Sequence, residues 1–237
     1  MAEPTGPIAA LRASHDRLAA LVAGLAPEAY TAQAYPKEWN VAAVLSHLGS
    51  GAEITALAFD AALAGDEAPG REVNPPIWDR WNAKAPADQV RDSIEVDEGL
   101  VRRFEALGAE QRANLRIGSF LGPVDVDTLA LLRLNEHAVH TWDVAVTLEP
   151  TATLGPEAVG YLLDSLGMLA KWTGKANGLS TVVSVATTEP TRAYALTLGK
   201  SVTLEPAAGS DPGDAVTLRL PAEALVRLVY GLSLIHI

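Results

Sequence analysis

The 237-residue chain contains no cysteine. It therefore forms no internal disulfide, offers no thiolate to a metal ion and has no cysteine nucleophile. If the chemistry of this protein involves a thiol, that thiol must arrive on another molecule.

Positive charge is scarce: 18 Lys and Arg stand against 29 Asp and Glu, for a formal net charge of −11. This balance argues against nucleic-acid binding, which needs a basic surface. Most of the basic residues are Arg, and Ala is abundant, as is typical of proteins from high-GC bacteria.

Long uninterrupted apolar runs are also missing, so no membrane span is expected. The N-terminal stretch MAEPTGPIAALRASHDRL lacks the basic and then apolar order of a signal peptide. We therefore expect a cytoplasmic protein, either a monomer or a homodimer. With 49% hydrophobic residues, the chain can bury a sizeable core in one large domain or two small ones.

Apolar residues recur at helical spacing along the first 150 residues. They predict four long helices, with Asn40 as an N-cap, Gly65 near a helix end, and Asp125 or Asp127 in a first turn. Four such helices favour an antiparallel four-helix bundle. The helices cover residues 7–25, 40–65, 87–107 and 122–148.

The pattern changes after Pro150, where one more helix precedes short segments rich in Val and Thr. We predict an α+β protein with a bundle domain over 1–150 and a small α+β domain over 151–237. The second domain is expected to contain helices at 156–174 and 222–231 and strands at 179–189, 192–199, 200–206 and 214–221.

The stretch RLNEHAVHTWDVA carries most of the titratable side chains of its helix. Glu136 and His140 are four residues apart, so they share a helix face and can reach one metal ion. His47 interrupts a second apolar helix and is the candidate third ligand. Three protein ligands and one open position are typical of catalytic zinc sites. The His and Glu ligands also suit other divalent metals.

Each feature also has a plainer interpretation: a lone His beside leucines is usually structural, and a Glu–His pair is usually exposed. Asp143 can orient a ligand histidine or act as an acid or base beside the open position. We expect His15 to lie on the surface, because Asp16 and Arg17 follow it. His137 and Trp142 are expected to be scaffold rather than ligands.

The segments KEWNVAAVLSHLGSGAEI, IWDRWNAKAP and LNEHAVHTWDVA resemble the mycothiol-dependent maleylpyruvate isomerase family, within the wider DinB-like metal-binding bundles. The resemblance covers most of the chain. It implies an actinobacterial, zinc-dependent enzyme with His47, Glu136 and His140 as ligands and Asp143 as a catalytic-site residue. The external thiol, mycothiol, would add to the cis double bond of maleylpyruvate, permit rotation and leave to give fumarylpyruvate.

Two other functions stay open: a mycothiol S-transferase acting on electrophiles, and a non-catalytic binding or regulatory module with a structural metal. Because maleylpyruvate is a dianion, the site needs further cations, for which Arg80 and Arg133 are candidates. Both of these arginines are more often surface ion-pair residues.

The last six residues, LSLIHI, replace the arginine and polar stretch with which the family commonly continues. A transposase-end sequencing adaptor, CTG TCT CTT ATA CAC ATC, translates to the same six residues. We therefore expect residues 232–237 to be adaptor-derived and the natural C-terminal domain to continue; whether the missing part carries a catalytic arginine stays open. Genomic codons for these residues would refute this hypothesis.

Overall fold

The structure, a computed structural model, describes residues 6–207 and 217–232. Its packing divides the chain into two compact units, Met1–Ala158 and Val159–Ile237. The division lies a few residues beyond the boundary near 150 that the sequence pattern indicates. Each unit is described by itself.

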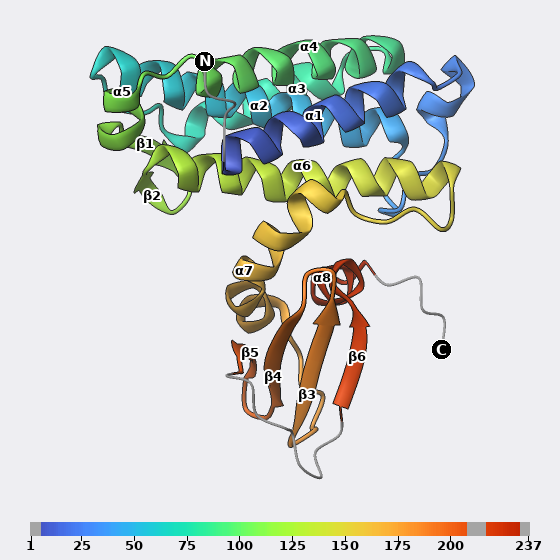
Figure 1. The fold of residues 1–237 in the computed structure, drawn as a ribbon. Helices are drawn as coiled ribbons and strands as arrows, with labels where there is room; N and C mark the ends of the chain where they lie inside the picture. Colours follow the sequence, from blue (N-terminus) through green and yellow to red (C-terminus); the bar gives the residue numbers. More distant parts are fainter. Residues whose placement is uncertain (1–5, 208–216, 233–237) are drawn as a thin grey trace. The chain divides into compact units, whose positions relative to one another are not determined.

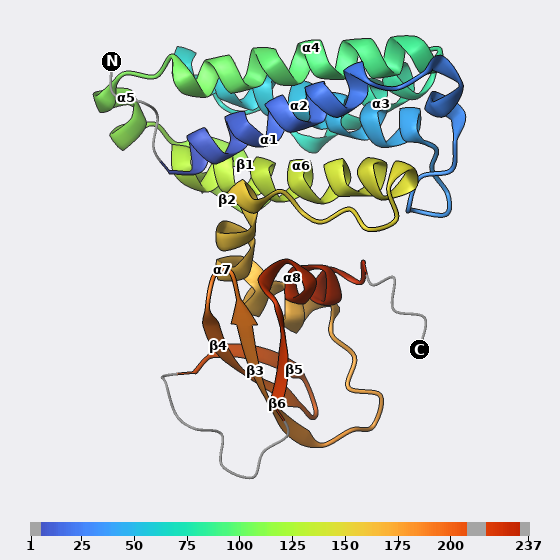
Figure 2. The same cartoon turned by 45° about the vertical axis from the view of Figure 1, so that its right-hand side comes forward.

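The first unit is built on four long helices (Figures 1 and 2). Around the bundle, α1 packs on α4, α4 on α2, α2 on α6, and α6 on α1. The predicted four-helix bundle is therefore confirmed. Its helices are α1 (Pro7–Ala23), α2 (Val41–Ala64), α4 (Pro86–Glu105) and α6 (Val126–Leu148).

Capping side chains fix where the two site-bearing helices begin. Asn40 Oδ1 accepts a hydrogen bond from the Ala43 amide at 2.8 Å, which starts α2. Asp125 Oδ1 accepts one from the Thr128 amide at 2.7 Å, which starts α6. Gly65, with φ 77°, adopts the left-handed conformation that ends α2.

The sequence pattern did not assign the short elements that surround the bundle. Helix α3 packs on α2, where Gly49 leaves room for the buried Trp81: an added Cβ would lie 2.3 Å from its ring. Strands β1 and β2 form an antiparallel hairpin. These elements are η1 (Pro27–Thr31), η2 (Arg71–Val73), α3 (Asn74–Asn82), α5 (Ala109–Asn114), β1 (Ile117–Ser119) and β2 (Gly122–Val124).

Helix α2 is the most apolar of the bundle helices, and it passes a test of length and composition for crossing a membrane. A core helix of a soluble protein passes the same test, and 56% of the apolar window of α2 is buried inside the structure. Its buried face joins α1, α4 and α6 in one core cluster. The members include Leu18, Val22, Val41, Val44, Leu45, Leu48, Val90 and Val144.

The second unit contains a four-stranded sheet in the order β5-β4-β3-β6. The β3–β4 and β4–β5 pairs are antiparallel, and β3–β6 is parallel. Helix α8 contacts β3 and β6. The predicted α+β class is confirmed. The elements are α7 (Pro156–Thr173, beginning in the first unit), β3 (Thr181–Thr188), β4 (Arg192–Leu198), β5 (Val202–Pro206), β6 (Thr217–Pro221) and α8 (Ala222–Tyr230).

The C-terminal tail bears on the adaptor hypothesis. Residues 233–237 lie outside the described residues. Of the tail, only Leu232 is described, and its amide donates to the Arg227 carbonyl at 2.8 Å. The origin of residues 232–237 therefore stays a prediction.

Candidate metal centre

Helices α2 and α6 bring together the three side chains that the sequence pattern selects as ligands. His47 Nε2 lies 3.1 Å from Glu136 Oε2, and His140 Nε2 lies 3.7 Å from the same oxygen. The two imidazole rings are 4.7 Å apart between centroids. One atom from each residue lies within 4.8 Å of the others, which is close enough for all three to bind one ion.

Asp143 holds the imidazole of His140 in a defined orientation. Its Oδ2 lies 2.6 Å from His140 Nδ1, so the other ring nitrogen, Nε2, faces Glu136. The Asp143 side chain is 1% exposed, and its second oxygen, Oδ1, is buried without a hydrogen-bond partner in the described part of the chain. A carboxylate behind a histidine is the arrangement that usually orients histidines toward a metal.

The charge state of Glu136 suits a cation. The hydrogen bond with His47 and the nearby His140 and Arg133 hold the pKa of its carboxyl below its usual range, although burial works the other way. The Glu136 side chain is 54% exposed and that of His47 37% exposed, so one side of the cluster is open to solvent. Two imidazole nitrogens and one carboxylate oxygen form a donor set that fits zinc or a similar divalent metal.

Trp39 lies beside the cluster. Its ring centroid is 5.1 Å from that of His47 and 5.9 Å from that of His140. In the sequence, this tryptophan belongs to the motif KEWNVAAVLSHLGSGAEI, and the pattern predicted no role for it at the site. Its position directly before the capping Asn40 was the available signal, because a residue there lies next to the first turns of α2.

Two expectations about other charged residues are wrong. His15 is not on the surface: it is 4% exposed, and its Nδ1 lies 2.8 Å from Asp97 Oδ2. Arg133 is not a surface ion-pair residue either: it is buried and pairs with Asp97 inside the bundle. Arg80 does pair with Glu53 near the surface, as expected.

The remaining residues of the predicted motif are buried. Trp142 is 1% exposed, packs edge-on against Tyr35 and donates its Nε1 proton to the Ala152 carbonyl at 2.8 Å. His137 is fully buried, and its Nδ1 lies 2.9 Å from Ser14 Oγ. Neither residue belongs to the His47, Glu136 and His140 group, but His137 lies in a second group of ligand-type side chains with His15 and Asp97.

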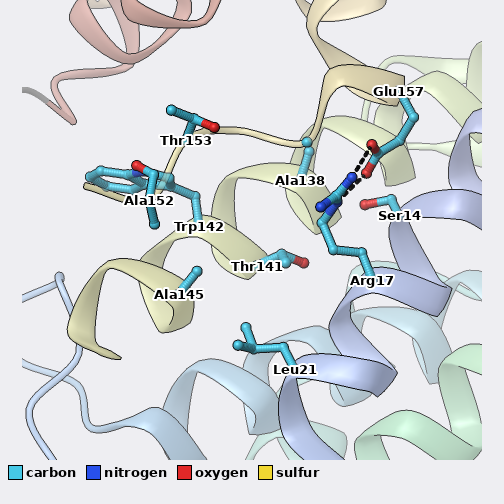
Figure 3. A pocket seen from close by; sticks show the side chains of 11 residues that line it. Ser14, Arg17, Leu21, Ala138, Thr141, Trp142, Ala145, Ala152, Thr153 and Glu157 are labelled. Carbon is cyan, nitrogen blue, oxygen red and sulfur yellow. Dashed lines mark hydrogen bonds and ion pairs between the residues drawn. The ribbon is translucent and has the colours of Figure 1, made fainter. Parts of the chain in front are cut away.

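A separate cavity of about 270 Å³ lies between α1, α6 and the segment that follows α6 (Figure 3). Its walls include Ser14 of α1 and Thr141 and Ala145 of α6. Thr141 and Ala145 project from another face of α6 than Glu136 does. The Arg17 guanidinium at this cavity is held by both oxygens of Glu157, each at 2.8 Å. The positive charge of Arg17 is therefore already paired with Glu157 and is not free to bind an anionic substrate in this cavity.

Comparison with known proteins gives consistent results. The sequence model described as "Mycothiol maleylpyruvate isomerase N-terminal domain" matches residues 11–145, a span that contains all the candidate ligands. No curated protein matches the sequence significantly.

Two solved structures share the fold, one a mycothiol-dependent maleylpyruvate isomerase and the other a histidine-to-alanine mutant of that enzyme. Each aligns with a TM-score of 0.69 and 14% identity, over 96% of this chain and 88% of the other. At this identity the likeness establishes the fold.

Proposed function

Since the chain belongs to the family of the mycothiol maleylpyruvate isomerase N-terminal domain, we propose that it is a metal-dependent enzyme that uses mycothiol to isomerise maleylpyruvate or a related electrophile. His47, Glu136 and His140 are the proposed metal ligands. Zinc is the proposed metal.

One observation carries the proposal: three ligand-type atoms from two helices converge on a point that is open on one side. Structural zinc sites usually have four protein ligands and are closed, whereas catalytic sites have three and keep one position open. The cluster offers three protein ligands and partly exposed side chains. This favours a catalytic site over a purely structural one.

When bound, the divalent metal would supply a Lewis acid at which a thiol is deprotonated near neutral pH. The side chains of this chain have the supporting roles. His47, His140 and the charged Glu136 hold the ion, and Asp143 keeps His140 turned toward it. Trp39 gives the site an apolar wall beside both imidazoles.

In the proposed reaction the sulfur of mycothiol forms a bond to one carbon of the cis double bond, and the electron pair of that double bond moves into the adjacent carbonyl as an enolate. The remaining carbon–carbon bond is then single and rotates. Collapse of the enolate restores the double bond in the trans form and expels the thiolate. The product is therefore an isomer of the substrate, and mycothiol is regenerated.

The direct test is an isomerase assay on the zinc-loaded full chain, with maleylpyruvate as substrate and with or without mycothiol. We expect fumarylpyruvate only when both the metal and mycothiol are present. Turnover without a thiol, or no metal bound by the wild-type chain, would refute the proposal. Stoichiometric consumption of mycothiol with a stable thioether product would instead identify a mycothiol S-transferase.

The two possible roles of Asp143 give different results for Asp143→Asn. If Asp143 orients His140, zinc affinity should fall by about 10–100-fold, as for other partners of metal-binding histidines. Competition with a chromogenic chelator measures this affinity. We expect this result because Asp143 is buried and lies 2.6 Å from His140 Nδ1.

Asp127→Asn is the matched control, since Asp127 lies on the same helix but pairs with Arg112 at the surface. It should leave zinc affinity unchanged. Unchanged zinc affinity in Asp143→Asn, combined with a lower kcat and the loss of one limb of the pH–rate profile, would show that Asp143 is the acid or base instead.

A further inference from the structure

A second cluster of ligand-type side chains lies inside the bundle, away from solvent. His15 on α1, Asp97 on α4 and His137 on α6 are 4%, 2% and 0% exposed. His15 Nδ1 lies 2.8 Å and His137 Nε2 lies 3.1 Å from the same carboxylate oxygen, Asp97 Oδ2. One atom from each of the three residues lies within 4.8 Å of the others.

The atoms of these three residues that point away from the cluster each have a separate partner. His15 Nε2 lies 3.1 Å from Glu98 Oε2, and Ser14 Oγ lies 2.9 Å from His137 Nδ1. Arg133 donates to Asp97 Oδ1 at 3.1 Å. Metal-binding histidines and carboxylates are usually held in this way, with the non-ligating atom hydrogen-bonded to a neighbour.

One of the inner atoms, by contrast, lacks a hydrogen-bond partner within the described residues. His137 Nε2 is fully buried and has no hydrogen-bond partner within the described structure, although it faces Asp97 Oδ2. If each imidazole carries its proton on the outer nitrogen, both inner lone pairs face a carboxylate oxygen. In that protonation state three acceptors converge in a buried space, where a cation among them would satisfy all three.

We propose that His15, Asp97 and His137 form a second divalent-metal site, which is buried and links α1, α4 and α6. Two imidazole nitrogens and one carboxylate oxygen are a donor set suited to Zn²⁺ and similar ions. The proposal does not depend on the reaction proposed above, because none of these residues belongs to the first centre.

Two carboxylates, Asp97 and Glu98, supply negative charge at this cluster. Asp97 Oδ2 lies against both inner imidazole nitrogens, at 2.8 Å from His15 Nδ1 and 3.1 Å from His137 Nε2. Glu98 adds a second negative charge beside His15, although it is also paired with Arg12 and Arg102. Arg133 contacts Oδ1 of Asp97, which leaves Oδ2 free for the cluster.

The cavity described above adjoins this cluster. Ser14 and Thr141 line the cavity (Figure 3). Their hydroxyls lie 2.9 Å and 3.4 Å from His137 Nδ1. This cavity, with a volume of about 270 Å³, therefore lies on the outer side of the His137 ring, away from the three inner atoms.

The number of zinc ions bound per chain tests this proposal. The full chain is stripped with a chelator, dialysed and titrated with Zn²⁺ in competition with a chromogenic indicator. We expect two tight equivalents in the wild type, one in His47→Ala, one in His15→Ala and none in the double variant. Saturation of the wild type at one equivalent, with none bound by His47→Ala, would overturn the second site.

The His47→Ala variant also allows a measurement that leaves the buried cluster unaltered, in case His15→Ala does not fold. In this variant, Zn²⁺ should shift the imidazole ¹⁵N resonances of His15 and His137 and raise the Tm. Unchanged resonances for both histidines would show that protons rather than a metal satisfy the cluster. Binding of two equivalents by a folded His15→Ala variant would place the second ion elsewhere and equally overturn the proposal.

Discussion

Replacing His47 by alanine is expected to prevent metal binding at the proposed site formed by His47, Glu136 and His140. It should also abolish the proposed isomerase activity. The two remaining ligands, Glu136 and His140, lie on one helix and provide only two of the three protein ligands that catalytic zinc sites usually have. A loss of several kcal/mol of Lewis-acid stabilisation corresponds to a fall in kcat/KM of about 10³-fold or more.

The variant should still fold, which makes the loss interpretable. The His47 side chain is 37% exposed, and truncation of such a partly exposed residue usually changes the free energy of unfolding by no more than about 1 kcal/mol. Chemical denaturation monitored by far-UV circular dichroism measures this change. Isothermal titration with Zn²⁺, supported by elemental analysis, measures the lost equivalent.

Glu136→Gln and Glu53→Gln provide a matched pair for the same test. Both replace a partly exposed glutamate by its neutral isostere, but Glu53 pairs with Arg80 and Trp81 rather than with the ligand histidines. Glu136→Gln should weaken zinc binding, and Glu53→Gln should not. Full zinc occupancy and wild-type activity in His47→Ala would remove His47 from the proposed ligands.

The grouping of His47, Glu136 and His140 was predictable in part because its signals are local. Glu136 and His140 have the spacing of one helix face, and His47 interrupts an apolar run that follows a clear capping residue, Asn40. The approach of α2 to α6 could not be derived from spacing, since it depends on packing across the bundle. The bundle fold and the resemblance to a known family supplied that step.

The buried cluster was missed for a physical reason. His15 is followed by Asp16 and Arg17, and neighbouring charges usually indicate a surface. Helical spacing was the better signal: His15 lies four residues after Leu11 and three before Leu18, on the face that those buried leucines share. The sequence around Asp97 did not indicate that this residue is buried, because single carboxylates on amphipathic helices are mostly exposed.

The short elements between the bundle helices could not be predicted from hydrophobic periodicity either. Strands β1 and β2 have three residues each, too few to establish alternation. Helix α3 carries two prolines near its start and depends on the burial of Trp81 in the space over Gly49. Such contacts are tertiary, and periodicity along one segment does not report them.

Asp97→Asn is expected to cause the largest loss of stability, about 3–5 kcal/mol, because it removes the negative charge that a buried Arg133 requires. The Arg133 side chain is only 7% exposed and reaches Asp97 Oδ1 at 3.1 Å and the Leu48 carbonyl at 3.4 Å. Its Nε is buried and has no hydrogen-bond partner among the residues that the structure describes. A neutral amide would leave the guanidinium charge uncompensated in the core.

Asp92→Asn is the control, with the same substitution on the same helix. Asp92 pairs with Lys84 at 2.8 Å, but its side chain is 23% exposed, so its loss should cost about 0–1 kcal/mol. Urea denaturation in the presence of a chelator measures both variants without any contribution from bound metal. The cost of Asp92→Asn should fall further in high salt, whereas that of Asp97→Asn should persist, since buried pairs are little screened. Equal, small costs for the two variants would show that Arg133 does not depend on Asp97 for its charge compensation.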